Sequence, residues 1–202
     1  EGMMKVIMRI ALIVHGGAGD ITGDGITRHR EGTRQATQVG WKILRDGGSA
    51  LDAVEASIIV MEDDPAFDAG YGSYLNRAGE VEMDASFMNG QTLDVGAVAG
   101  VQRIKNPIRL VRRIMESEHT FLIGRGAEQF AEEMGMTLID NKELQAPEQI
   151  EKWKQSIANP PAPKSARYVP AKGGTVGCVA MDRNGNIAAG TSTGGMQFKR
   201  VG

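Results

Sequence analysis

The 202-residue sequence predicts an α+β fold in which helices and strands occur in separate blocks. Two helical segments follow one another at 27–46 and 50–63, and two strands come next at 81–86 and 93–101. A further strand pair near the end of the chain is joined by an Asn-Gly turn. Blocks of this kind favour layers of helices and strands over a regular βαβ repeat.

The first third of the chain predicts one strand and two helices. Residues 6–14 form an apolar, β-branched run that is typical of a buried strand, and the glycine-rich segment "HGGAGDITGDG" follows it. The helix over 27–46 carries a broad apolar face and ends at a Gly-Gly pair. Ser49 is expected to cap the second helix, which ends before Pro65.

The middle of the chain predicts two strands, a helix, a short strand and a short helix. The strand over 93–101 is nearly continuous in small apolar residues, so we expect it to be central and covered on both faces. The helix "NPIRLVRRIMES" begins with Asn106 as N-cap and Pro107 at its first position. "TFLIG" predicts the short strand, and "GAEQFAEEMG" predicts the short helix.

The last third changes character at a proline-rich segment. Residues 159–174 contain four prolines, two lysines and no amphipathic period, which predicts a flexible, exposed linker. Strands over 175–181 and 187–189 follow, joined through "DRNGN" as a hairpin.

Composition excludes several classes of protein. A net charge of -2 favours neither a nucleic acid nor an anionic membrane as a partner, and no apolar run reaches the ~18 residues of a membrane span. The N-terminal apolar run leads into "HGGAGD", which is not a signal-peptide cleavage site. A single cysteine fits a reducing compartment, so we expect a cytoplasmic location.

Most motifs that suggest chemistry have a simpler interpretation. The loop beginning at Gly17 lacks the G-x-G-x-x-G spacing, so a tight turn that packs backbone against backbone is favoured over nucleotide binding. His15, His29 and His119 lie outside zinc motifs, and His29 is interpreted as a surface residue. No G-x-S-x-G elbow identifies a nucleophilic serine, so a Ser–His–Asp triad stays open without a candidate. Cys178 lies in an apolar strand and is predicted to be a core residue.

Thr175 has a chemical interpretation because of its position. As a β-branched residue it simply suits the start of a strand. A threonine hydroxyl becomes a good nucleophile when a base lies beside it, and its own α-amine, with a pKa of about 7.7–8.0, is such a base. That requires cleavage of the bond after Gly174. Glycine before the bond, a flexible segment upstream and a rigid strand downstream all favour such cleavage.

Five segments resemble one known family in the same order. They are "VHGGAGD", "GGSALDAVEASI", "DAGYGSYLNRAGEVEMDASFMNG", "GAVAGVQRIKNPIRLVRRIME" and "GGTVGCVAMDRNGNIAAGTSTGG". Together they are similar to the plant-type (type III) L-asparaginase and isoaspartyl dipeptidase family of N-terminal nucleophile hydrolases. The resemblance covers most of the chain apart from the linker and the first few residues.

The resemblance implies a four-layered αββα sandwich, incomplete in this chain, within one folding domain. It implies a precursor that cleaves itself between Gly174 and Thr175, so that residues 1–174 form the α-subunit region and 175–202 begin the β subunit. It implies hydrolysis of the side-chain amide of L-asparagine and of β-aspartyl dipeptides. Thr175 corresponds to the nucleophile, and Thr193 to the threonine that hydrogen-bonds it. An (αβ)2 homo-oligomer is also implied.

The resemblance implies no organic cofactor but a structural sodium ion. Main-chain carbonyls at the end of the second helix and in the loop after it would hold this ion, and carbonyl oxygens suit such a hard cation. The matching positions are Met61, Glu62, Asp64, Phe67, Ala69 and Tyr71.

Two departures from the family pattern affect these expectations. Asp68 replaces an asparagine near the nucleophile, which removes two donors and adds a charge. The sequence stops at "MQFKRVG", so the family's substrate-binding arginine and aspartate and its oxyanion hole are expected beyond Gly202. We therefore interpret the chain as truncated and inactive alone. The alternatives are a non-catalytic product or a subunit that acts only by pairing, and, within the enzymes, a glycosylasparaginase-like amidase.

Overall fold

A computed structural model describes residues 9–19, 21–159 and 174–202. Most of the predicted linker and the start of the first predicted strand lie outside these ranges. The described elements, in chain order, are β1 (Ala11–His15), α1 (Asp24–Arg45), α2 (Ala50–Glu62), the 3₁₀ turn η1 (Gly70–Gly72), β2 (Met83–Asn89), β3 (Val95–Val101), α3 (Pro107–Met115), β4 (Phe121–Ile123), α4 (Gly124–Glu133), the 3₁₀ turn η2 (Asn141–Leu144), α5 (Pro147–Ala158), β5 (Val176–Met181) and β6 (Ile187–Thr193).

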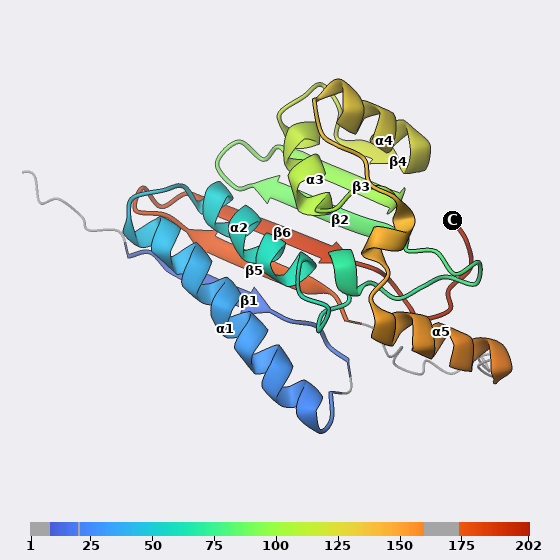
Figure 1. The fold of residues 1–202 in the computed structure, drawn as a ribbon. Helices are drawn as coiled ribbons and strands as arrows, with labels where there is room; N and C mark the ends of the chain where they lie inside the picture. Colours follow the sequence, from blue (N-terminus) through green and yellow to red (C-terminus); the bar gives the residue numbers. More distant parts are fainter. Residues whose placement is uncertain (1–8, 20, 160–173) are drawn as a thin grey trace, which may run out of the picture.

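The strands form a six-stranded sheet in the order β1-β5-β6-β2-β3-β4 (Figure 1). Neighbouring strands are antiparallel except for β3 and β4, which are parallel. The β5–β6 hairpin, although it comes last in the chain, lies between β1 and β2. This order places β1 and β5, which are far apart in the sequence, side by side, with His15 opposite Gly177.

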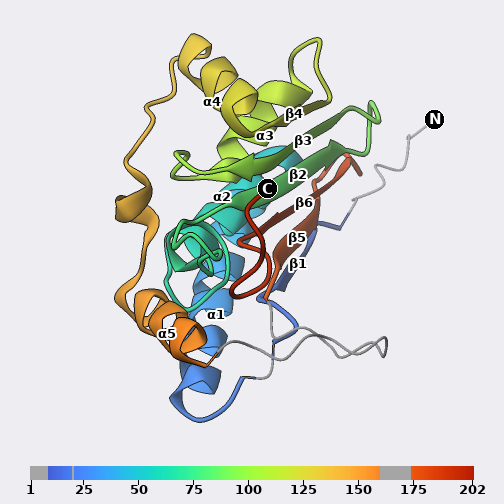
Figure 2. The same ribbon diagram turned by 90° about the vertical axis from the view of Figure 1, so that its right-hand side faces the viewer.

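Helices cover one face of this sheet (Figure 2). Helix α2 packs on β5 and β6, α3 packs on β2 and β3, and α1 packs on α2 and β1. The core between the helices and the sheet is apolar at positions such as Leu44, Ile58, Phe87 and Ile108. The predicted combination of helical blocks with adjacent strands is therefore confirmed, whereas the four-layered sandwich that the resemblance implies stays a prediction.

The opposite face of the sheet is open in the described part of the chain. Apolar side chains cross it in register: Ile13 pairs with Val179, Val179 with Ala189, Ala189 with Met88, and Met88 with Val95. Ile13 is 72% exposed and Val179 is 45% exposed. Such a continuous exposed apolar row on a sheet is typical of a surface that packs against something else.

The prediction that the strand over 93–101 is covered on both faces is wrong for the described residues. Strand β3 packs on helix α3 with one face, while Val95 is exposed on the other. Its small residues have another cause: a Cβ on Gly96 would clash with the Val111 carbonyl and lie 2.8 Å from the Met115 nitrogen. Close approach of α3, rather than burial on two sides, explains the small side chains.

Local signals located the helix ends well. The Ser49 hydroxyl accepts a hydrogen bond from the Asp52 nitrogen at 3.1 Å, as expected of an N-cap. Asn106 occupies the N-cap position of α3, but its amide donates to Asp63 at 3.1 Å and makes no capping bond. Glu62, at the end of α2, instead accepts from the Ile108 nitrogen at 3.1 Å. The Glu62 carboxyl group of α2 thus caps α3.

The hairpin turn also follows its sequence signal. Gly185 has φ +81°, a conformation that favours glycine, and its nitrogen donates to the Asp182 carbonyl at 3.0 Å. The Asp182 side chain accepts from the nitrogens of Asn184 and Asn186 at 2.9 and 3.1 Å.

None of the helices in the described ranges is both long enough and apolar enough to cross a bilayer.

Candidate active site

Thr175 and Thr193 are brought together by the pairing of β5 with β6. Thr175 directly precedes β5, and Thr193 is the last residue of the antiparallel neighbour β6. The Thr175 hydroxyl donates to Thr193 Oγ1 at 3.1 Å, and the Thr193 hydroxyl donates to the Gly174 carbonyl at 3.2 Å. The Gly195 nitrogen donates to Thr193 Oγ1 at 3.0 Å. A short chain of hydrogen bonds therefore connects the Thr175 hydroxyl with the carbonyl of the peptide bond that precedes Thr175.

Thr193 faces the open side of the sheet. It alternates along β6 with Ser192, which is fully buried beneath the sheet. The two threonine hydroxyls therefore meet on the open face where β6 ends, four residues along the strand from Ala189 of the apolar row. A small molecule could reach them from this side without passing the helical layer.

Asp68 holds Gly174 from the other side. Its Oδ2 accepts from the Gly174 nitrogen at 3.3 Å, and its Oδ1 accepts from the Tyr74 nitrogen at 3.0 Å. Its own carbonyl accepts from the Gly194 nitrogen at 3.0 Å. Burial raises the pKa of this carboxyl to about 7, against the opposing effect of hydrogen bonds from Tyr74 and Gly174. The hydrogen bonds of the carboxyl thus fix the residue before Thr175 rather than Thr175 itself.

The glycine-rich loop after β1 lies against the same peptide bond. Gly17 has φ +112°, and a Cβ there would lie 3.0 Å from Gly174 Cα and 3.4 Å from the Thr175 nitrogen. Only glycine allows this backbone conformation and this close approach together. The role predicted for the loop, packing backbone against backbone, is confirmed, and its partner is the Gly174–Thr175 bond.

His15 is a member of this site that sequence reasoning missed. Its Nδ1 lies 3.0 Å from the Thr175 carbonyl oxygen and 3.2 Å from the Gly17 nitrogen. A single ring nitrogen either donates to the carbonyl or accepts from the amide, depending on the tautomer. The signal that could have found it is its place at the end of β1, directly before the Gly-Gly pair.

A cavity of about 500 Å3 adjoins the Gly174 side of the site. Polar and charged side chains contribute much of its lining, including Arg28, Tyr74, Gln149, Lys152 and Gln197. Gln149 is 5% exposed, and its Oε1 has no hydrogen-bond partner in the part of the chain that the structure describes.

The substrate-binding residues were expected beyond Gly202. Gly202 itself makes structural contacts. Its nitrogen donates to the Glu82 carboxylate at 3.2 Å, directly before β2. The Lys199 ammonium donates to the Glu82 carbonyl at 2.8 Å, so the segment after β6 is held at two points against the start of β2. Gly202 itself is therefore not assigned to the site. A substrate clamp beyond it stays a prediction that none of the described contacts tests.

The six predicted sodium-ligand positions span the end of α2, the loop after it and η1. A Cβ on Gly70 would clash with the Glu62 carbonyl, and one on Gly72 with the Phe67 carbonyl, so both oxygens point into a turn that only glycine leaves open. The Asp64 and Ala69 carbonyls accept from Phe67 and Gly72 nitrogens at 3.1 and 3.2 Å, which leaves a lone pair on each. These hard oxygen donors fit a cation of the sodium type.

The remaining candidate residues have structural surroundings. Cys178 is 2% exposed, and burial raises its pKa to about 11, so the prediction of a core residue is confirmed. His29 is partly buried instead of lying free on the surface, because its ring packs edge-on against Phe67 at 5.0 Å and its Nδ1 lies 3.0 Å from the Gly25 carbonyl. Across the described ranges, no cluster of three or more histidine, cysteine, aspartate or glutamate side chains could hold a metal ion.

Comparison with known proteins agrees with this arrangement. The family model described as asparaginase matches residues 8–202, which is nearly the whole chain. The chain belongs to the asparaginase family. It is 46% identical over 202 residues to an isoaspartyl peptidase/L-asparaginase of Mus musculus and 47% identical over 199 residues to that of Homo sapiens. A plant-type L-asparaginase of Pyrococcus furiosus is 44% identical over 208 residues.

Each alignment covers nearly all of this chain but a smaller share of the relative. The alignments include 98% of this chain but 61% of the mouse relative, and 96% of this chain but 63% of the human one. For the archaeal relative the values are 96% and 66%. The chain thus spans about three fifths of the length of the mammalian asparaginase-family proteins that it matches.

Proposed function

We propose that this chain is part of an autoproteolytically activated amidohydrolase with Thr175 as its N-terminal nucleophile. Its substrates are L-asparagine, from which it releases ammonia, and β-aspartyl dipeptides. The observation that supports this proposal best is the hydrogen-bond chain from the Thr175 hydroxyl through Thr193 to the Gly174 carbonyl. The names of the relatives, isoaspartyl peptidase/L-asparaginase and plant-type L-asparaginase, support the class of reaction.

The self-cleavage begins with attack of Thr175 Oγ1 on the Gly174 carbonyl carbon. The Thr193 hydroxyl donates to the carbonyl oxygen and polarises it, while Gly17 and Asp68 hold the Gly174 backbone. The C–N bond breaks as the amide nitrogen takes up the hydroxyl proton, and Gly174 is left as an ester on Thr175. Water then hydrolyses this ester, which yields a Gly174 carboxylate and a free α-amine on Thr175.

Substrate hydrolysis reuses the same oxygen. The free α-amine accepts the Thr175 hydroxyl proton, Oγ1 attacks the side-chain amide carbon of asparagine, and ammonia departs with a proton from the amine. Water then cleaves the aspartyl ester and regenerates the hydroxyl. A β-aspartyl dipeptide follows the same course, with its second amino acid as leaving group.

Several further properties belong to this proposal. The apolar row on the open face suits packing against a second sheet, as in a four-layered αββα sandwich. The carbonyl-lined loop would hold a structural sodium ion, which stabilises the segment that carries Asp68. Residues beyond Gly202 would supply the substrate clamp. An (αβ)2 homo-oligomer and a cytoplasmic location complete the proposal.

The test is mass spectrometry of the full-length gene product. We expect a new amino terminus at Thr175 and ammonia release from L-asparagine. Thr175→Ala should abolish both, because one hydroxyl serves both reactions. Thr191→Ala is the matched control, since that hydroxyl donates to the Val176 carbonyl at 2.8 Å and takes no part in the chain of hydrogen bonds to Gly174. Cleavage at this bond in Thr175→Ala would contradict the nucleophile assignment, and an intact protein that never cleaves would favour a pairing subunit.

A further inference from the structure

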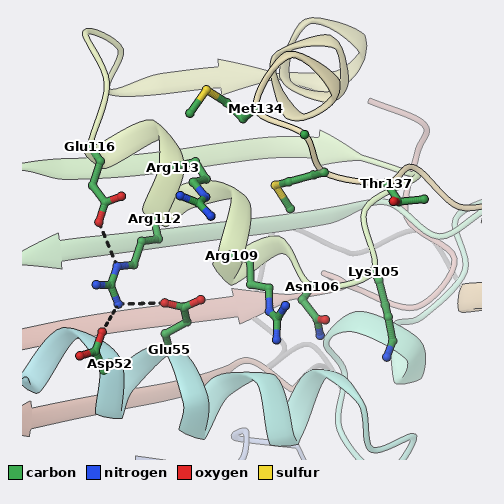
Figure 3. A pocket seen from close by; sticks show the side chains of 12 residues that line it. Asp52, Glu55, Lys105, Asn106, Arg109, Arg112, Arg113, Glu116, Met134 and Thr137 are labelled. Atoms are coloured by element: carbon green, nitrogen blue, oxygen red, sulfur yellow. Dashed lines mark hydrogen bonds and ion pairs between the residues drawn. The ribbon is translucent and has the colours of Figure 1, made fainter. Parts of the chain in front are cut away.

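A second cavity lies among α2, α3 and the segment after α4, and it shares no residue with the lining around Gly174. Its volume is about 600 Å3. Figure 3 shows its lining, to which α2 and α3 contribute charged side chains and the segment after α4 contributes Met134, Met136 and Thr137. The charged residues of this lining are Asp52, Glu55, Lys105, Arg109, Arg112, Arg113 and Glu116.

The carboxylates of this cavity are already engaged. Arg112 bonds Asp52 at 2.8 Å, Glu55 at 2.9 Å and Glu116 at 3.1 Å (Figure 3). The Arg112 side chain is only 20% exposed, and its contacts with Asp52 and Glu55 connect α3 to α2. This network fixes the acidic side chains at one end of the cavity, so that they are held around a single guanidinium.

Two other arginines of the same helix lack such partners. Arg109 and Arg113 are exposed, and neither guanidinium makes a hydrogen bond or ion pair with any described residue. They are four residues apart on α3, so they lie on the same face of the helix, where like charges repel. Lys105 adds a third cation to the lining, although it lies 3.3 Å from Asp63.

We propose that this cavity is a binding site for a small oxyanion with carboxylate or phosphate groups. The guanidinium forks of Arg109 and Arg113 present donors in the planar arrangement that suits such oxygens. The Thr137 hydroxyl and the Lys105 ammonium supply further donors along the same lining. A bound anion would also relieve the repulsion between the two arginines. This site is separate from the proposed catalytic reaction and does not depend on it.

Calorimetric titration of the chain with inorganic phosphate, and separately with succinate, tests the site. Ionic strength is kept constant with sodium chloride in both titrations. We expect saturable binding of at least one anion with one site per chain. Arg109→Gln and Arg113→Gln should each weaken it by about tenfold or more, because a hydrogen bond to a charged group contributes this much to affinity.

Arg30→Gln is the matched control, because it removes an exposed arginine of α1 whose guanidinium makes no hydrogen bond or ion pair with a described residue. It should leave the affinity within twofold of the unchanged protein. Arg113→Lys keeps the charge but loses the guanidinium fork, so it should bind the anion with intermediate affinity. This result would distinguish a loss of binding from a loss of folding. Preference for phosphate or for succinate identifies the class of the anion. Absence of saturable binding, or equal affinity in Arg30→Gln and both α3 variants, would overturn the proposal.

Discussion

At the scale of single residues, the Thr193 hydroxyl is the centre of the contacts around the Gly174–Thr175 bond. It accepts from Thr175 and from the Gly195 nitrogen, and it donates to Gly174. Asp68 and Gly17 hold the same peptide from two further directions. Each of these contacts can be removed separately, so their contributions can be measured one at a time.

Thr193→Val should slow self-cleavage by about 10²-fold, the usual effect of losing one donor to a reacting carbonyl oxygen. Valine keeps the shape and the strand preference of threonine, so the fold should persist. The time course of the new Thr175 terminus in full-length protein, followed by mass spectrometry, gives the rate. Thr191→Val serves as control on the same strand, and an unchanged rate in Thr193→Val would show that its hydroxyl does not assist the step.

Asp68→Asn should change how stability depends on pH. Folding raises the pKa of Asp68 from its ordinary value to about 7, so the folded state favours the protonated carboxyl. Its stabilising contribution is complete below about pH 4 and is lost as pH rises towards 7. Asparagine does not titrate, so the variant does not lose this contribution as pH rises. The contribution to the free energy of unfolding is at most about 4 kcal/mol.

Urea unfolding between pH 4 and pH 8 measures this effect. The stability of Asp68→Asn relative to the unchanged chain should increase with pH over that range. Asp24→Asn, at the exposed start of α1, is measured beside it as the control for losing an exposed carboxyl. A profile of Asp68→Asn parallel to that of the unchanged chain would show that the Asp68 carboxyl titrates normally.

The Cys178 thiol should resist labelling in the folded chain. Burial raises its pKa to about 11, and thiolate is the species that reacts. Iodoacetamide at pH 8 should modify it only after urea is added, as read by intact mass. Rapid labelling without denaturant would mean that β5 opens easily.

At the scale of elements, the packing of α1 on α2 depends on a glycine. A Cβ on Gly40 would clash with Ser57 Oγ and lie 3.0 Å from the Ala53 carbonyl. The Ser57 hydroxyl in turn donates to the Ala36 carbonyl at 3.0 Å, which joins the two helices. This contact sets how closely α1 and α2 approach each other.

Gly40→Ala should therefore destabilise the chain by about 1–3 kcal/mol, the usual cost of overpacking. Gly126→Ala is an informative counterpart, because Gly126 lies within α4 and has open space around its Cβ position. That change should stabilise by about 0.5–1 kcal/mol, since alanine favours the helix. Thermal unfolding of both variants reports the two opposite signs; destabilisation of equal size in both would refute the packing argument.

The elements that the sequence predicted well are those with local signals. Ser49, Pro107 and the Asn-Gly turn act within a few residues of themselves, and the structure has them where they were expected. Capping of α3 by Glu62 was missed because the two groups are 46 residues apart. The small residues of β3 were misinterpreted for the same reason, since the helix that approaches them comes later in the chain.

The candidate site shows a similar division. Thr175 was predicted from its junction and Thr193 from the family resemblance, whereas the contact of His15 with the Thr175 carbonyl, 160 residues away, needed the strand order. The spacing of residues in the sequence does not indicate that β1 lies beside β5. Neither the second cavity nor its two arginines without a partner among the described residues has a sequence signal, because both depend on which carboxylates bind Arg112.

At the scale of the whole molecule, the open face of the sheet determines how the chain behaves in solution. The apolar row from Ile13 to Val95 invites association between chains. Val179→Lys should reduce light scattering of the 202-residue chain at high concentration. Ile26→Lys, which replaces an equally exposed side chain on α1, should have a smaller effect.

The same Val179 variant should have the opposite consequence in full-length protein. If a second sheet covers this face, a buried lysine there should lower the melting temperature strongly, because an unpaired charge in an apolar interface is costly. An unchanged melting temperature would show that the face stays open to solvent and would count against the four-layered sandwich.

The position of the β5–β6 hairpin between β1 and β2 has a consequence for any cut before Thr175. The hairpin would then be a separate polypeptide, yet its backbone would remain hydrogen-bonded on both sides to strands of the upstream piece. These backbone hydrogen bonds would hold the two pieces together. Severing the chain would free an amine without releasing a subunit, and the two pieces, expressed as separate polypeptides, should be able to find each other and restore one sheet.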